Sequence, residues 1–437
     1  MLRCGAPLGR TVARTKVVSE ALSTMNKVAR ASASAQQQPG PILPSMNAWS
    51  DPAVYSATRR PIDEAFTLPG SVYHDEAFFK LERDRVFKSS WVAVAELCDI
   101  ANPGDIIPAN VGGSPIILAN DKGTIRAFHN VCRHRGARLV KEKCTKRRTI
   151  LCPYHRWGYA LDGRLLAMPA FDDEASGKKL PEHIRETFST KHVKDFDKEA
   201  NGLFPVRVET FLGLAFVNLN AEAPPLKEWL GDLVPALADY DESLGASGPG
   251  LHPVARKTYD VAANWKVLLE NYLEYYHLPA VHPELCNVSG VDEHVRKQGK
   301  GMYMGFATEP LSRGGTPIDP GRLPPFPTLH AWHTEMAYHI AIFPNTFFSL
   351  YPDAFFRIVL NPSSAERTIE HATLLTHKGA LEAEDAEAKL KETFEFWDLI
   401  NSQDIDICEN VQQGTSVDAY QGGRFSFRFE EPGERRG

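Results

Sequence analysis

Short stretches of alternating apolar and polar residues, separated by turns, dominate the chain from about residue 91 to 220. The expected strands include VAVAEL, PIILAN, TIRAFHNV, GRLLAMP and GLAFVNLN, and two of the turns are Asp121-Lys122-Gly123 and Asp162-Gly163. Alternation with a period of two is typical of strands with one buried face, and Gly and Asp favour the tight turns between antiparallel neighbours. We therefore predict an antiparallel β domain here.

A different periodicity follows in the second half of the chain. Residues 262–276 and 381–413 repeat their apolar positions with the helical period, and residues 337–360 and 368–375 between them have the pattern of strands. The predicted fold class is therefore α+β, with a β domain followed by a domain of helices and strands.

The composition is that of a globular protein. The chain has 437 residues, of which 43% are hydrophobic and 24% charged, and its length suggests two or three domains. Lys and Arg number 49 against 55 Asp and Glu, and the net charge of -6 makes nucleic acid an unsuitable partner. No stretch has the uninterrupted apolar residues of a membrane helix, so no membrane span is expected.

The N-terminal segment has a separate character. Up to residue 40 its only acidic residue is Glu20, while Arg and Lys are scattered among Ala, Ser, Thr and Gln. This composition predicts an organellar transit peptide, assigned to residues 1–44; the alternative is a disordered tail.

Two Cys/His loops carry the strongest chemical signal. The strings NVCRHRGARL and CPYHRWGYALDGRL place Cys132 with His134 and Cys152 with His155. A Rieske [2Fe-2S] cluster needs two thiolates on one iron and two imidazoles on the other, which one Cys and one His from each of two facing loops would supply. A single zinc ion is the alternative, although zinc motifs usually pair Cys with Cys and His with His.

Both loops resemble those of the Rieske-type non-haem iron oxygenases, the family of ring-hydroxylating oxygenase alpha subunits. The likeness includes Arg135-Gly136 after the first pair and Trp157 and Asp162-Gly163 after the second. Arg156 departs from the family, which usually has Gly at this position. By the family pattern, Cys144 is not a ligand.

The resemblance also implies a domain organisation. It predicts an N-terminal antiparallel β Rieske domain over residues 85–205 and a catalytic domain over residues 206–437. The catalytic domain is expected to have a helix-grip fold of the START/Bet v1-like type that holds a mononuclear Fe(II). The segment 45–84 is expected to contact this catalytic domain.

The candidate iron ligands begin in the string NWKVLLENYLEYYHLPAVHPEL. Glu274 and His277 are three residues apart and would share one face of a helix. His282 is five residues beyond His277, and Pro279 between them is expected to break the helix so that the chain turns His282 back.

A carboxylate would complete this site. Two His and one carboxylate leave coordination positions open and are diagnostic of non-haem Fe(II) oxygenases. In the string NSQDIDICENVQQG, the resemblance assigns the ligand to Asp404, with Asp406 and Glu409 as near alternatives.

The resemblance gives Glu274 a catalytic role instead of a ligand role. In the family, a carboxylate at this position links a Rieske histidine of one subunit to an iron-binding histidine of its neighbour. This implies a homotrimer in which electrons cross between chains.

The second half of the chain looks most like the quaternary-ammonium branch of the family. A trimethylammonium group is recognised by aromatic faces, and the alternative for any aromatic residue in these strands is plain core. The candidates for the aromatic cage are Trp332, Tyr338, Phe343, Phe348 and Tyr351.

The activity implied is the oxidation of choline to betaine aldehyde hydrate, the first step of glycine betaine synthesis. Reduced ferredoxin or a ferredoxin-like reductase and O₂ would be the partners, and the chloroplast stroma the compartment, with the mitochondrion as alternative. The spacing between Glu274 and His277 instead resembles bacterial members that cleave betaine or carnitine, so N-demethylation or C–N cleavage stays open. A Rieske electron-transfer protein without oxygenase activity is the alternative from another class.

Overall fold

The computed structural model describes residues 48–169, 194–244, 250–286, 294–308, 323–426 and 429–430. Met1–Trp49 separates from the rest as a unit of its own, and Ser50–Gly437 forms the other. The predicted transit peptide, residues 1–44, lies outside the described residues.

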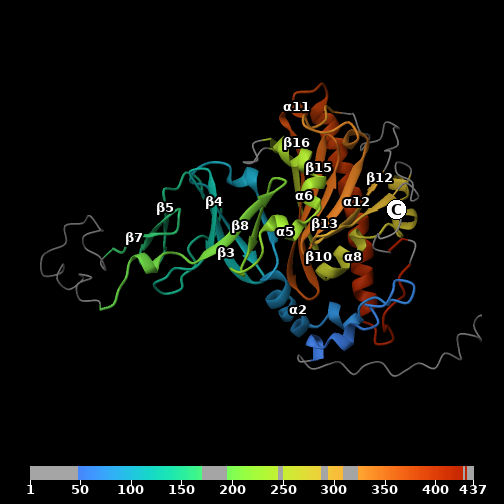
Figure 1. Ribbon diagram of the computed structural model, residues 1–437, viewed down its shortest axis with the longest axis horizontal. Helices are drawn as coiled ribbons and strands as arrows, with labels where there is room; N and C mark the ends of the chain where they lie inside the picture. Colours follow the sequence, from blue (N-terminus) through green and yellow to red (C-terminus); the bar gives the residue numbers. More distant parts are fainter. Residues whose placement is uncertain are drawn as a thin grey trace, which may run out of the picture. The chain divides into compact units, whose positions relative to one another are not determined.

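An antiparallel six-stranded sheet forms the core of the first domain (Figure 1). Its strand order is β1-β9-β8-β4-β3-β2. These strands are β1 Val92–Glu96, β2 Ile106–Val111, β3 Ser114–Asp121, β4 Thr124–His129, β8 Pro205–Phe211 and β9 Leu214–Asn218. The predicted antiparallel β domain is confirmed, but its boundary at residue 205 is corrected, because β8 and β9 pair with β1 and β4 and carry this sheet to residue 218.

A small three-stranded sheet, β5-β6-β7, carries one of the two Cys/His loops. It consists of β5 Thr149–Leu151, β6 Gly158–Ala160 and β7 Leu165–Ala167. One loop follows β4 and the other joins β5 to β6. Both loops close over a hydrophobic cluster that includes Phe128, Ile150 and Tyr159, so the sheet edges and this cluster fix where the loops lie.

The second domain is built on an antiparallel seven-stranded sheet in the order β10-β16-β15-β14-β13-β12-β11. The predicted strands over 337–360 and 368–375 are confirmed. The strands are β10 Leu251–Val261, β11 His294–Lys297, β12 Tyr303–Thr308, β13 Ala337–Ile342, β14 Thr346–Leu350, β15 Ala354–Ser364 and β16 Arg367–His377. Strand β10 was not predicted from the sequence, because most of its side chains face solvent.

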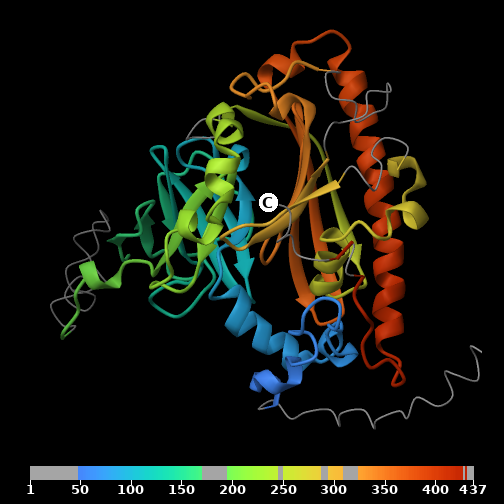
Figure 2. The same ribbon diagram turned by 45° about the vertical axis from the view of Figure 1, so that its right-hand side comes forward.

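The long helix α12 (Ala386–Thr415) and the short helix α8 (Trp265–Tyr272) cover one face of this sheet. Figure 2 shows α12, in red, running beside the orange strands. The helix buries a stripe of side chains that includes Leu390, Trp397 and Ile400. This amphipathic pattern predicted the helix, and burying the stripe stabilises it against the sheet.

The remaining described helices are short. They are η1 Ala48–Ser50, η2 Pro52–Tyr55, η3 Gly70–Tyr73, α2 Glu76–Glu82, η4 Arg83–Phe87, η5 Leu97–Ile100, η7 Glu199–Asn201, α5 Leu226–Leu230, α6 Leu233–Ala236, α7 Ala238–Leu244, α9 Leu278–Val281, α10 Pro283–Cys286, η9 His333–Glu335 and α11 Lys378–Leu381. Among the helices described, none is both long enough and apolar enough to cross a bilayer.

The helix break in the NWKVLLENYLEYYHLPAVHPEL segment lies earlier than predicted. Helix α8 ends at Tyr272, and Pro279 sits in the first turn of α9 instead of breaking a longer helix. A proline is tolerated there because the first turn leaves its N–H groups without helical acceptors. His277 and His282 therefore flank one short helix, as its N-cap and C-cap residues.

The segment before the β domain holds α8 in place. The Tyr73 hydroxyl donates to Glu270 at 2.8 Å, and Lys266 pairs with Glu82 of α2 at 2.8 Å, both side chains being buried. Burial raises the pKa of Glu270 to about 7, although the hydrogen bond from Tyr73 acts in the opposite direction. Tyr73 and Glu82 thus connect this segment to α8.

Two buried polar side chains join the two domains. The amide of Asn345 exchanges hydrogen bonds with the backbone of Ala93, at 3.1 and 2.9 Å. Arg357 of β15 donates to the carbonyl oxygen of Leu212 at 2.6 Å and pairs with Glu96 at 2.8 Å. Buried charges need such partners, so these contacts fix the first domain against the catalytic sheet.

Candidate active site

The two Cys/His loops adopt the same turn. The N–H of Gly136 donates to the carbonyl oxygen of Cys132 at 3.0 Å, and the N–H of Arg156 donates to that of Cys152 at 3.1 Å. Gly136 and Arg156 both have positive φ, 67° and 61°. Glycine is the residue that adopts this region without strain, which explains why the family favours Gly where this chain has Arg156.

The four side chains form a buried pair and an exposed pair. The thiols of Cys132 and Cys152 are buried, whereas the imidazoles of His134 and His155 lie at the surface with their ring centroids 4.7 Å apart. The Tyr159 hydroxyl lies 3.3 Å from Sγ of Cys132 and can donate to a thiolate there.

This separation decides between one metal ion and two. A zinc ion would hold all four ligand atoms around one centre. Among the described residues, three or more potential ligand atoms lie this close together only at His277, His282 and Asp404. Thiols on one side and imidazoles on the other fit a cluster with two irons. The arrangement of the four side chains therefore favours the two-iron cluster over the zinc alternative.

Arg156 offers a test of this turn. Because a non-glycine residue at positive φ is strained by about 1 kcal/mol, Arg156→Gly is expected to raise the free energy of unfolding by up to about that amount, measured by urea denaturation of the holoprotein. The matched control is Gly136→Arg, where a Cβ meets nothing within 4 Å at φ +67°, so it should lose a similar amount. An unchanged stability in both variants would contradict the account.

A second group of ligands lies in the catalytic domain. His277, His282 and Asp404 each offer one potential ligand atom, and these three atoms lie within 4.8 Å of one another. Nε2 of His277 and Nε2 of His282 lie 3.4 and 2.9 Å from Oδ1 of Asp404. The two histidines come from the ends of α9, and Asp404 comes from α12. The structure thus brings together the three residues predicted to hold iron, and two imidazoles with one carboxylate fit Fe(II).

Each imidazole is oriented by its other nitrogen. Nδ1 of His277 lies 2.5 Å from Oε1 of Glu274, and Nδ1 of His282 lies 2.8 Å from Oε1 of Gln403. Both partners are oxygen acceptors to which Nδ1 can donate, so Nε2 of each ring faces Asp404, where a bound metal ion would take the place of a proton. Burial lowers the pKa of His277, but hydrogen bonds to Asp404 and Glu274 outweigh it and raise the value to about 9. The site therefore has a strongly anionic character.

Gln403 was not predicted from the sequence, and its role can be measured. Gln403→Leu removes the acceptor of His282 and is expected to weaken iron binding about tenfold to a hundredfold, the usual effect of losing such a partner. Retention of iron during titration with a chelator measures this. Gln413→Leu, at an exposed glutamine of the same helix, is the control, and equal retention in the two variants would refute the role of Gln403.

Glu274 lies beside the iron ligands, as predicted, but not on a helix. It follows the end of α8, and its Oε2 accepts hydrogen bonds from the backbone N–H groups of Tyr276 and His277. Its side chain keeps 19% of its surface exposed. This exposure leaves room for a contact from another chain, and the predicted link to a neighbouring Rieske histidine stays a prediction.

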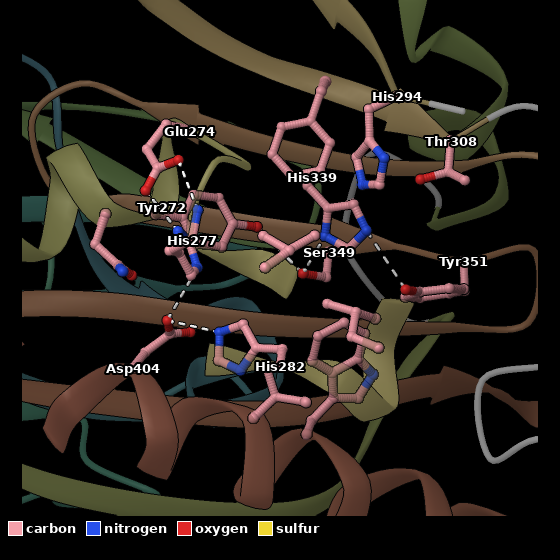
Figure 3. Close-up of a pocket in the computed structure, with 16 residues that line it drawn as sticks. Tyr272, Glu274, His277, His282, His294, Thr308, His339, Ser349, Tyr351 and Asp404 are labelled. Carbon is pink, nitrogen blue, oxygen red and sulfur yellow. Dashed lines mark hydrogen bonds and ion pairs between the residues drawn. The ribbon is translucent and has the colours of Figure 1, made fainter. Parts of the chain in front are cut away.

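A pocket opens beside the three candidate ligands (Figure 3). Figure 3 places Glu274, His277 and Asp404 toward one end and Tyr351, His294 and Thr308 toward the other. The lining combines aromatic rings, aliphatic side chains and neutral polar groups. Its residues are Asn271, Tyr272, Glu274, His277, Leu278, His282, Leu285, His294, Phe306, Thr308, His339, Ser349, Tyr351, Trp397, Ile400 and Asp404.

Of the five predicted cage residues, the structure places only Tyr351 in this pocket. Tyr338 and Phe348 belong to the hydrophobic core on the other side of the sheet. Phe343 contacts Trp265, and Trp332 is 53% exposed. Tyr338 and Phe348 were mispredicted because β13 and β14, to which they belong, are buried along their whole length, so an aromatic residue there does not reveal which face it occupies. Trp332 and Phe343 lie outside these two strands.

The aromatic residues that do line the pocket include three that sequence reasoning missed: Tyr272, Phe306 and Trp397. One of them had a signal. Trp397 precedes Asp404 by seven residues, which is two helical turns, so it lies on the same face of α12 as the ligand. Phe306 comes from a strand that periodicity did not predict.

Comparisons with known proteins agree with both centres. Residues 90–186 match the Rieske [2Fe-2S] domain family, and residues 250–435 match the ring hydroxylating alpha subunit (catalytic domain) family. The glycine betaine monooxygenase oxygenase subunit of Chromohalobacter salexigens is 30% identical, covering 83% of this chain and 82% of the relative. The subunit of the same name from Pseudomonas aeruginosa is 27% identical, covering 89% and 90%.

A solved structure with a similar fold is that of a quaternary ammonium Rieske monooxygenase described in connection with carnitine oxidation by gut microbiota. Its TM-score is 0.67 and its identity 26%, and the match covers 83% of this chain and 89% of that one. A [2Fe-2S] cluster and a mononuclear non-haem iron are thus the cofactors of this chain, as in the related oxygenases.

Proposed function

Because the chain belongs to the Rieske non-haem iron oxygenases, we propose that it is the oxygenase component of a monooxygenase that oxidises a quaternary ammonium compound. The observation that carries the proposal is the pocket beside His277, His282 and Asp404. Relatives and a solved structure with quaternary ammonium substrates in their names support it.

The lining of the pocket suits a cation. Four of its described residues, Tyr272, Phe306, Tyr351 and Trp397, present aromatic rings, and its two carboxylates belong to Glu274 and Asp404. Aromatic faces and a negative potential both attract a trimethylammonium group. The pocket lining that the structure describes includes neither Lys nor Arg.

The lack of a cationic partner among these residues favours choline within the quaternary ammonium class. Glycine betaine and carnitine carry a carboxylate, which binding sites usually pair with Arg or Lys. Choline has a neutral hydroxyl group instead and leaves no charge unpaired here. The proposed reaction is therefore the monooxygenation of choline at the alcohol carbon, which gives betaine aldehyde hydrate and water from O₂, two electrons and two protons.

The protein groups have defined tasks in this reaction. Bound iron would supply a centre that activates O₂ next to the substrate. His277, His282 and Asp404 would hold it, while Glu274 and Gln403 keep the two imidazoles in the tautomer that binds through Nε2. Tyr272, Phe306 and Trp397 would hold the ammonium group and, with Leu278 and Ile400, exclude bulk water from the reacting carbon.

The proposal extends to the partners. Cys132, His134, Cys152 and His155 would hold the cluster that accepts electrons from reduced ferredoxin or a ferredoxin-like reductase. Glu274 would connect this cluster to the iron site of a neighbouring chain in a homotrimer. The N-terminal composition suggests delivery to the chloroplast stroma, with the mitochondrion as the alternative.

The test is turnover with a panel of substrates. The reduced protein, supplied with ferredoxin, its reductase and O₂, is incubated separately with choline, glycine betaine and carnitine, and the products are read by mass spectrometry. Betaine aldehyde from choline is expected. Formaldehyde with a demethylated amine would move the chain to the N-demethylating alternative, and no product from any of the three would contradict a quaternary ammonium oxygenase.

A further inference from the structure

A chain of hydrogen-bonding groups runs along one wall of the pocket that also holds the candidate iron ligands. Tyr272 OH donates to the carbonyl oxygen of Phe348 at 2.8 Å and lies 3.1 Å from Oγ of Ser349. Oγ of Ser349 lies 3.0 Å from Nδ1 of His339, and Nε2 of His339 lies 3.5 Å from the hydroxyl of Tyr351. Figure 3 shows His339 between Ser349 and Tyr351.

The backbone carbonyl sets the direction of every proton in this chain. A carbonyl oxygen only accepts, so the single proton of Tyr272 OH points to Phe348. Ser349 must then donate its own proton to Tyr272, and its oxygen is left to accept from His339. The proton of the imidazole is therefore on Nδ1, and Nε2 carries a lone pair.

The imidazole of His339 is held neutral. Burial, together with the nearby His294, lowers its pKa to about 3, so a cationic form that could donate from both nitrogens is not populated near neutral pH. On the Tyr351 side, the separation of 3.5 Å from Nε2 is at the outer limit of a hydrogen bond. Nε2 of His339 thus accepts at most a weak hydrogen bond from the protein, and the Tyr351 hydroxyl proton is free to be donated to a ligand instead.

We propose that Nε2 of His339 and the hydroxyl of Tyr351 form a subsite that recognises a hydroxyl group of the substrate. The inference rests on the proposed function and deepens it, since it names the group that distinguishes the substrate within the quaternary ammonium class. A substrate hydroxyl donates to Nε2 and accepts from Tyr351, so both partners are satisfied at once.

Other groups satisfy this subsite less well. A carboxylate has no proton to donate, so it would face the lone pair of Nε2. An alkyl group would leave His339 Nε2 and the Tyr351 hydroxyl with only their long mutual contact of 3.5 Å. A site built to bind a hydroxyl discriminates strongly against an analogue that lacks it, because its polar groups are then left unpaired. His339 is therefore a specificity-determining residue.

The experiment measures equilibrium binding by calorimetry to the anaerobic holoprotein. The probes are choline, ethyltrimethylammonium, which replaces the hydroxyl by hydrogen, and glycine betaine. Wild-type protein is expected to bind choline at least about tenfold more tightly than ethyltrimethylammonium. His339→Leu should reduce this ratio to about one, whereas His339→Gln, whose amide still offers an acceptor, should keep most of it.

Two further variants separate the subsite from general effects on the pocket. Ile400→Ala removes an apolar part of the pocket lining and keeps both His339 and Tyr351, so it should weaken the binding of choline and of ethyltrimethylammonium by the same factor. Ser349→Ala frees the tautomer of His339, which can then donate from Nε2, so it should narrow the preference for choline over glycine betaine.

The outcomes distinguish this inference from the proposed function. If wild-type protein binds choline and ethyltrimethylammonium equally, the subsite is refuted while the quaternary ammonium assignment stands. If a folded His339→Leu protein keeps the wild-type ratio, His339 is not the recognising group. If none of the three quaternary ammonium compounds binds, the proposed function itself fails.

Discussion

Asp404→Ala is expected to remove the mononuclear iron and to lower turnover by at least a factor of about a hundred, while the [2Fe-2S] cluster stays bound. Asp404 is the only carboxylate in the three-residue ligand group found in the described part of the chain. Without it, only two imidazoles are left to hold the iron. Losing a hydrogen-bond partner of a ligand already lowers metal affinity about tenfold to a hundredfold, and losing a ligand itself should lower it further.

Iron content per chain and the visible spectrum of the cluster measure the two centres separately. The matched control is Asp406→Ala, which removes an exposed carboxylate two residues away on the same helix. This control is expected to keep three irons per chain. If Asp404→Ala also keeps three irons, or if Asp406→Ala loses one, the ligand has been misassigned.

Glu274→Ala is expected to have the second largest effect and a different signature. Both metals should still load when iron is in excess, because His277, His282 and Asp404 are intact, although the mononuclear iron should be held less tightly, as in Gln403→Leu. Product formation per bound iron should fall about a hundredfold. The reason is that Glu274 fixes His277 through the contact of 2.5 Å and is proposed to carry the link to a Rieske histidine of a neighbouring chain.

The measurement is the rate at which the reduced cluster is oxidised after O₂ and choline are added, compared with the yield of product in one turnover. Glu274→Gln serves as the comparison, since it keeps the size and one acceptor oxygen but removes the charge, and it should lie between wild type and Glu274→Ala. Normal product yield in Glu274→Ala would refute the role of Glu274.

The local parts of the site could be predicted from the sequence. Cys132, His134, Cys152 and His155 lie in two short loops whose spacing alone indicates their chemistry, and the structure confirms the paired turns. His277 and His282 are likewise close in sequence. The sequence correctly predicted that these two side chains lie near each other, but the expected helix break at Pro279 was wrong, since the helix already ends at Tyr272.

The long-range parts depend on tertiary structure. Asp404 reaches the histidines because α12 lies against the sheet more than a hundred residues later, and it was identified by resemblance to a family, not by spacing. The pocket wall was missed for a related reason. In the register of β13 and β14, His339 lies opposite Ser349, while Tyr338 lies opposite Leu350 on the other face.

A one-residue shift along a strand exchanges the two faces. Because both faces of these strands are buried, the hydrophobic pattern does not distinguish the core face, which takes Tyr338 and Phe348, from the pocket face, which takes His339 and Ser349. Polar residues within a fully buried strand would have been the better signal, since buried polar groups need partners and often mark a site.

The most direct test of the whole account is a single turnover without an external electron donor. The holoprotein is reduced at both centres under anaerobic conditions, freed of reductant, and mixed with choline and O₂. A fully reduced chain holds the two electrons that one monooxygenation consumes, so the account predicts nearly one betaine aldehyde per mononuclear iron. Oxidation of both centres without any oxidised product from choline, glycine betaine or carnitine would contradict it.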